Sequence, residues 1–345
     1  MAFPAGGATP PRATPSWHRS RGAGSPRPQP LDRGGTRLAR RGRWFVLAGL
    51  IAAGAWSLTA AEPSPKPRGL WFWSKPGSPY GSVNVLGNPA REDEALASFA
   101  RWNVRRLYGS YGALPVEAPE RVAAWNRRLH EAGVRSLTLF SDGGALSGSG
   151  RERFLREVEE RVLAFNAART DPRERFDGIA LDVEPHALPV WKTTTGEGRR
   201  ALMEEFVAMC GALRARLDAR GGRDLPLSAA LAYWLDRLPP DGRVAWQTAA
   251  DRDDWFARLG KSVPVISLMA YERSAPAAIL DAVAWERAHF SGRVITALRA
   301  RMGVEWQTLS DLARVLPEVE ATSTDGVDLE NYELLRRAEQ PDRSG

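Results

Sequence analysis

Several residue types that mark metalloproteins or disulfide-bonded proteins are scarce in this chain of 345 residues. It has one cysteine, Cys210, so no intrachain disulfide can form, and the place of this residue on the apolar stripe of an expected helix predicts a buried, inert thiol. The four histidines show no metal-ligand spacing, so we expect neither a metal site nor a cofactor. No glycine-rich phosphate loop follows any expected strand, which argues against a nucleotide-binding open sheet.

Positive charge is in excess only at one end of the chain. The net charge is +7, but residues 1–43 contain nine arginines and a single acid, Asp32, and therefore carry +8 by themselves. The rest of the chain has a net charge of −1. A nearly neutral body gives no electrostatic reason to expect nucleic-acid binding, although the isoelectric point is basic.

The first 67 residues lack the periodic patterns of a folded domain. Residues 1–43, rich in Pro, Gly, Arg and Ser, predict a disordered basic arm. Residues 44–61 carry no charge, follow a basic stretch and end in small residues, which predicts a signal peptide or, as the alternative, an uncleaved membrane anchor. Residues 62–67 form a proline-rich linker. We therefore expect an exported protein that is periplasmic, in the cell envelope or secreted.

Residues 68–340 alternate between strand-like and helix-like segments. The strand-like segments begin near Gly69, Val104, Val134, Phe176, Leu225, Val263, Arg293 and Asp325. Between them apolar residues recur every three or four positions, the spacing of helices that cover a sheet. Eight alternations over this length predict an α/β fold with a single (β/α)8 barrel rather than a doubly wound open sheet. We expect it to be a monomer.

Two carboxylates lie at the end of the fourth of these strands. Asp182 and Glu184 are two residues apart in segment 176–186, so they share one face of the strand. Each ionised acid raises the pKa of the other, a cost that a purely structural strand has no reason to accept but that a proton-sharing site requires. The carboxyl ends of barrel strands form the reactive face. Both acids are therefore candidate catalytic residues, whereas Asp177, at the other end of the strand, is expected to make a structural contact.

Aromatic and acidic side chains also follow the other strands. The candidate substrate-binding residues are Trp73, Tyr108, Trp234, Glu272 and His186. Flat aromatic rings beside carboxyls suit sugars, whose rings offer apolar faces rimmed by hydroxyls.

Two segments resemble the family 18 glycoside hydrolases, the chitinases and their relatives. The fourth strand of that family reads Asp-Gly-x-Asp-x-Asp-x-Glu, and residues 177–184 match it at three of the four acids, with Ala180 in place of the second. Residues 265–272 resemble the family's sixth strand, which ends Met-x-Tyr-Asp, with Glu272 where Asp is usual. The order and the separation of the two segments suit the barrel of this family.

The resemblance implies a function and roles for three residues. Glu184 would be the general acid, Asp182 would orient the N-acetyl group of the substrate, and Tyr271 would donate a hydrogen bond to the acetamido oxygen. The chain would then be a hydrolase that cleaves a β-linked polysaccharide containing N-acetylhexosamine, such as chitin, peptidoglycan or an exopolysaccharide, by substrate-assisted acid catalysis. The acid missing at Ala180 usually shares a proton with the orienting aspartate, so we expect Asp182 to ionise more easily here.

Two alternatives remain open on the sequence. The first is a catalytically inactive, chitinase-like protein that only binds glycans in the cell envelope; the presence of Glu184 argues against it, because chitinase-like lectins commonly lose that acid. The second is a retaining hydrolase with its second carboxylate on the seventh strand, for which the nearest downstream acid is Glu305.

Overall fold

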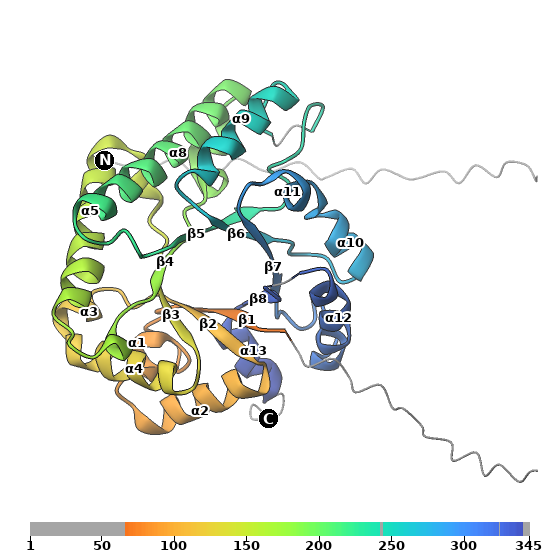
Figure 1. The fold of residues 1–345 in the computed structure, drawn as a ribbon. Coiled ribbons are helices and arrows are strands. Elements are labelled where there is room, and N and C mark those ends of the chain that lie inside the picture. The colour runs from red at the N-terminus through yellow and green to blue at the C-terminus, as the bar shows by residue number, and fades with distance from the viewer. Residues whose placement is uncertain (1–65, 242–243, 324, 341–345) are drawn as a thin grey trace, which may run out of the picture. The chain divides into compact units, whose positions relative to one another are not determined.

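The computed structural model describes residues 66–241, 244–323 and 325–340, which form a closed barrel of eight parallel strands (Figure 1). The expected basic arm (1–43), the signal or anchor segment (44–61) and most of the linker lie outside the described residues. None of the helices in the described part of the chain has both the length and the apolar character that crossing a membrane requires.

Each strand pairs in parallel with the next one in the sequence, and the last pairs with the first. The strands are β1 (Arg68–Phe72), β2 (Val104–Gly109), β3 (Arg135–Phe140), β4 (Gly178–Leu181), β5 (Leu227–Ala232), β6 (Val265–Met269), β7 (Arg293–Arg299) and β8 (Val327–Glu330). Each begins within two residues of its predicted start. The predicted (β/α)8 barrel is therefore confirmed.

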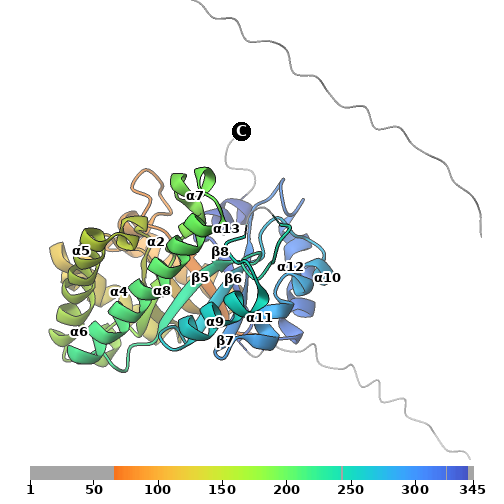
Figure 2. The same cartoon turned by 90° about the horizontal axis from the view of Figure 1, so that it is seen from above.

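Helices surround the strands on the outside of the barrel (Figures 1 and 2). They are α1 (Ser82–Val85), α2 (Pro89–Arg101), α3 (Leu114–Glu117), α4 (Pro119–Glu131), α5 (Gly148–Val158), α6 (Phe165–Ala167), α7 (Pro189–Thr193), α8 (Gly196–Ala219), α9 (Ala249–Gly260), α10 (Pro276–Asp281), α11 (Ala284–His289), α12 (Leu309–Ala321) and α13 (Tyr332–Glu339). Short helical turns η1 (Gly143–Leu146), η3 (Pro172–Glu174) and η4 (Pro185–Ala187) and a π-helical segment η2 (Glu159–Ala164) complete the connections.

The longest helix shows how the sequence pattern builds the outer layer. On α8, Phe206, Met209 and Leu213 recur every three or four positions and are fully buried. Cys210 lies beside them with no exposed surface, and burial raises the pKa of its thiol well above the ordinary value. The prediction that this thiol is buried is confirmed.

A polar network crosses the inside of the barrel. Asp328 on β8 is fully buried and accepts hydrogen bonds from Arg106 at 2.8 Å, Tyr108 at 3.0 Å and Ser267 at 2.7 Å. A β-carbon on Gly69 of β1 would lie 1.9 Å from the Asp328 carboxylate, so only glycine leaves room for this acid. The network joins β2, β6 and β8, and each donor offsets part of the cost of burying the charge.

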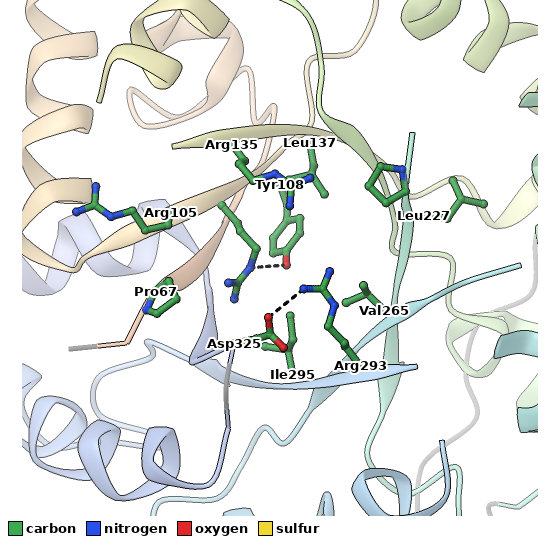
Figure 3. A pocket seen from close by; sticks show the side chains of 12 residues that line it. Pro67, Arg105, Tyr108, Arg135, Leu137, Leu227, Val265, Arg293, Ile295 and Asp325 are labelled. Carbon is green, nitrogen blue, oxygen red and sulfur yellow. Dashed lines mark hydrogen bonds and ion pairs between the residues drawn. The ribbon is translucent and has the colours of Figure 1, made fainter. Parts of the chain in front are cut away.

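A small cavity of about 190 Å³ opens at the amino ends of the strands (Figure 3). Arg105, Arg106 and Arg135 line it from β2 and β3, and Arg293 of β7 pairs with Asp325 at 3.1 Å. This is the end of a barrel at which side chains serve stability. Reactive groups are therefore expected at the opposite, carboxyl end.

The carboxyl of Glu286, on α11, should make the stability of the fold depend on pH. It is fully buried, and neither of its oxygens has a hydrogen-bond partner among the described residues. Burial, together with the negative charge of Asp236, raises the pKa of Glu286 from 4.5 to about 8. The folded state keeps a proton that the unfolded chain releases, so the free energy of unfolding falls as the pH rises from 4.5 to 8, by on the order of 4 kcal/mol.

We expect Glu286→Gln, which stays neutral, to abolish this part of the pH dependence. Urea unfolding at several values across that pH range measures it. Glu318→Gln, at an exposed position of α12, is the matched control and should keep the wild-type slope. An unchanged slope in Glu286→Gln would contradict the prediction.

Candidate active site

The carboxyl ends of β4 to β8 surround a cavity of about 380 Å³. Its lining includes five residues that the sequence singled out, namely Glu184, His186, Trp234, Tyr271 and Glu272. It also includes Arg299 and Glu330, which the sequence analysis did not select. The cavity lies at the end of the barrel where the reactive groups were predicted.

The local sequence explains how β4 delivers its acids. The strand itself, Gly178–Leu181, is buried throughout, and the backbone N–H of Asp182 still donates to the carbonyl of Phe140 on β3 at 2.8 Å. Pro185 then begins a turn, because proline has no N–H with which to continue the strand pairing. Glu184 is the last extended residue before that turn.

The carboxyls of Asp182 and Glu184 act on each other. Burial raises the pKa of Asp182, and the negative charges of Glu184 and Glu330 raise it further. Burial and the charge of Glu330 also raise the pKa of Glu184, while its hydrogen bond with Asp182 lowers it. A hydrogen bond between two carboxyls requires a proton on one of them, so the pair holds a proton to higher pH than isolated carboxyls do.

This result corrects one expectation from the sequence. Asp182 was expected to ionise more easily because Ala180 replaces the second motif acid. Its pKa is instead raised, because its Oδ1 atom is buried without a hydrogen-bond partner in the described structure and because Glu330 contributes a negative charge from another strand.

Tyr271 and Glu272 follow β6 and reach the same cavity. Burial raises the pKa of the Tyr271 phenol well above its ordinary value, and the charges of the surrounding acids raise it further, so the hydroxyl remains a hydrogen-bond donor. The guanidinium of Arg299 lies 5.1 Å from the centre of the Tyr271 ring. Glu272 is exposed and lines the cavity, so it lies at the rim, and its φ of 63° is in the left-handed region.

An aromatic wall forms one side of the cavity. The Trp234 ring packs edge-on against His186 at 5.2 Å and lies 6.3 Å from the Trp191 ring. Burial lowers the pKa of His186 to about 4, so the imidazole is neutral at pH 7. Its Nε2 atom lies 3.5 Å from Glu184, and a neutral ring there adds no positive charge that would lower the pKa of that carboxyl.

Two predicted substrate contacts lie elsewhere. Tyr108 is buried in the barrel interior, where its hydroxyl donates to Asp328, and it lines the cavity at the amino end (Figure 3). Trp73 is half-buried just after β1 and does not contribute to the lining of the 380 Å³ cavity. Asp177 makes the structural contact expected of it, accepting from the backbone N–H of Ser136 at 2.6 Å.

A carboxylate that the sequence analysis did not select lines the cavity from β8, and none comes from the seventh strand in the described residues. Glu305, the acid considered for a retaining mechanism, is buried and accepts a hydrogen bond from Arg299 at 2.8 Å. The cavity is lined instead by Glu330, at the end of Val327–Glu330. A signal for it was present, because Asp328 and Glu330 repeat the acid-x-acid spacing of Asp182 and Glu184 at the end of another predicted strand.

Within the described residues, no group of three or more His, Cys, Asp or Glu side chains is arranged to hold a metal ion.

No protein-family model matches this chain, and no curated protein sequence matches it. Solved structures similar to it include a chitinase from Chromobacterium violaceum, with 14% identity over 68% of each chain and a TM-score of 0.40. A chitinase from Bacteroides thetaiotaomicron has 10% identity over 82% of this chain and 99% of its own, with a TM-score of 0.47. An exo-β-1,4-mannosidase from Opitutaceae bacterium strain TAV5 has 15% identity over 76% of this chain and 51% of its own, also with a TM-score of 0.47. Likeness at these identities and scores carries no argument about substrate or reaction.

Proposed function

We propose that the protein is an exported glycoside hydrolase that cleaves a β-linked polysaccharide containing N-acetylhexosamine, such as chitin, peptidoglycan or an exopolysaccharide. The observation that supports this proposal is the pair of neighbouring carboxyls, Asp182 and Glu184, at the carboxyl end of β4, near the donor Tyr271 and the ring of Trp234; the pKa of each acid is raised. Paired acids and a hydroxyl donor suit the hydrolysis of a glycosidic bond between amino sugars, and a flat aromatic ring suits the binding of a sugar ring.

In the first step Glu184 donates its proton to the glycosidic oxygen while the bond from that oxygen to the anomeric carbon breaks. The acetamido oxygen of the same sugar attacks the anomeric carbon and forms a cyclic oxazolinium ion. Asp182 accepts a hydrogen bond from the N–H of that ion, and Tyr271 donates one to the acetamido oxygen as it moves into place.

In the second step the Glu184 carboxylate accepts a proton from a water molecule, whose oxygen attacks the anomeric carbon. The bond from that carbon to the acetamido oxygen breaks, the acetamido group is restored, and Glu184 is again protonated. Trp234 would offer an apolar face to one sugar ring, and His186 and Glu272, which line the same cavity, would contact its hydroxyls.

The experiment that tests the proposal follows a labelled oligosaccharide. Wild-type protein is incubated with end-labelled oligomers of N-acetylglucosamine and with peptidoglycan, and the products are separated by size. A hydrolase releases shorter labelled products. Retention of uncut label by the protein would support the alternative, a glycan-binding protein of the envelope without activity.

Export and a monomeric state belong to the same proposal and have their own tests. Residues 44–61 carry the argument for export, and cell fractionation with and without them would locate the protein. A release into the soluble envelope fraction points to cleavage, and recovery with membranes points to an anchor. Light scattering of the full chain measures the oligomeric state.

A further inference from the structure

Glu330 lines the cavity, but the proposed mechanism gives its carboxylate no role. It ends β8, four strands from β4 in either direction around the closed barrel, so it faces the Asp182–Glu184 pair from the opposite wall. It is half-buried and lines the same cavity as Glu184. Its Oε1 atom accepts a hydrogen bond from Asn331 at 3.3 Å, and its Oε2 atom is buried without a partner in the described structure.

The cations nearest to Glu330 already have carboxylate partners. Arg299, at the end of the neighbouring strand β7, is bound to Glu305 at 2.8 Å. Lys75, in the connection after β1, is bound to Glu333 of α13 at 2.8 Å. The negative charge of Glu330 is therefore only partly compensated on its own side of the cavity.

The other groups around the cavity do not compensate it either. Tyr271 beyond β6 is a neutral phenol, and His186 beyond β4 is a neutral imidazole. Glu272 adds a further acid at the exposed rim. The carboxyls of Asp182, Glu184 and Glu330 thus lie close together in a site that is partly shielded from solvent. Their mutual repulsion favours states in which at least one of them keeps its proton.

We propose that Glu330 supplies, from β8, the third carboxylate that the motif lacks at Ala180, and that it acts as a positioning residue which keeps the proton on the Asp182–Glu184 pair. The inference rests on the proposed function, in which Glu184 must be protonated before the sugar bond breaks. Acids from two strands would thereby hold the proton that, in the motif, neighbouring acids of one strand share. Because Ala180 has only a methyl group, the charge has to come from across the barrel.

The first test is the pH dependence of kcat/KM, which reports the protonation of the free enzyme. Glu330→Gln keeps the shape of the side chain and removes its charge. Without that charge the pair loses its proton more readily, so the alkaline limb of the profile should move to lower pH by about one unit or more. Below that limb the variant should keep its activity within about threefold of wild type, since the proton is then present in both proteins.

Glu272→Gln is the matched control, because it removes the same charge at the exposed rim of the same cavity. Solvent screens that charge, so its alkaline limb should move by less than about 0.3 units. A uniform loss of activity in Glu330→Gln, with the limb unmoved, would overturn the inference and indicate a merely structural role. Equal shifts in the two variants would overturn it as well, because a general charge effect would then explain both.

A second measurement does not depend on activity. Carboxyl carbons of Asp and Glu in the full chain are labelled with 13C and titrated by NMR, and the pair is assigned from the signals lost in Asp182→Asn and Glu184→Gln. The midpoints of the pair should fall by about one unit in Glu330→Gln. Unchanged midpoints would overturn the role of Glu330. A shift of the midpoints in a protein that cuts no tested glycan would leave this role intact and reject the hydrolase.

Discussion

Glu184→Gln should lower kcat on N-acetylglucosamine oligomers by at least about a hundredfold, the usual contribution of a general acid. The amide keeps the shape of the side chain and its contact with the cavity but has no acidic proton for the leaving oxygen. Glycan binding should stay within about threefold of wild type, since the aromatic wall around Trp234 is unchanged. Initial rates and equilibrium binding of the same oligomer measure the two effects.

The control for this variant is Glu318→Gln, the same exchange at an exposed position of α12, which should behave as wild type. A Glu184→Gln protein that still cuts the oligomer at the wild-type rate would remove Glu184 as the acid. If neither wild type nor variant cuts it while both bind it, the glycan-binding alternative replaces the hydrolase.

Asp182→Asn should be nearly as damaging on substrates that carry an N-acetyl group, with a loss of about a hundredfold in kcat. The reason is that the oxazolinium ion bears a positive charge, which a carboxylate stabilises and an amide does not. Comparison of kcat on an N-acetylated substrate and on its counterpart without the acetyl group measures the effect. The loss should be confined to the first, because only the acetylated sugar can form the ion.

A mild effect of Asp182→Asn, below about tenfold on both substrates, would show that the acetamido group does not assist. The two-carboxylate mechanism would then become the better description, with Glu330 opposite Glu184 as the second group. Retention or inversion at the anomeric carbon, followed by NMR of the first product, would identify its form.

The sequence was sufficient for the architecture because local patterns carry it. Eight strand-like segments that alternate with amphipathic helices are typical of a closed (β/α)8 barrel. Each strand begins within two residues of its predicted start. The pair of Asp182 and Glu184 was equally accessible, since a spacing of two on one strand places both side chains on one face.

The position of Tyr108 along the barrel axis could not be predicted from the sequence pattern. Alternation along β2 places its side chain inside the barrel, but height along the axis depends on the tilt and stagger of the strands. The ring consequently lies deep in the interior, bonded to Asp328, instead of at the carboxyl end. Trp73 lies just beyond β1 and outside the lining of the 380 Å³ cavity, a place that could not be predicted because the course of a connection is not encoded in strand periodicity.

The chain by itself thus determined the barrel and the acid pair that follows β4 at its carboxyl end, because each depends on patterns of residues near in sequence. Only the tertiary structure decided which distant groups share the cavity with that pair. Closure of the barrel brings Glu330, Arg299 and Tyr271 to the same cavity as Glu184, and the packing around His186 keeps its ring neutral. Protonation at the site depends on these charges through space, and no spacing along the chain encodes the distances between them.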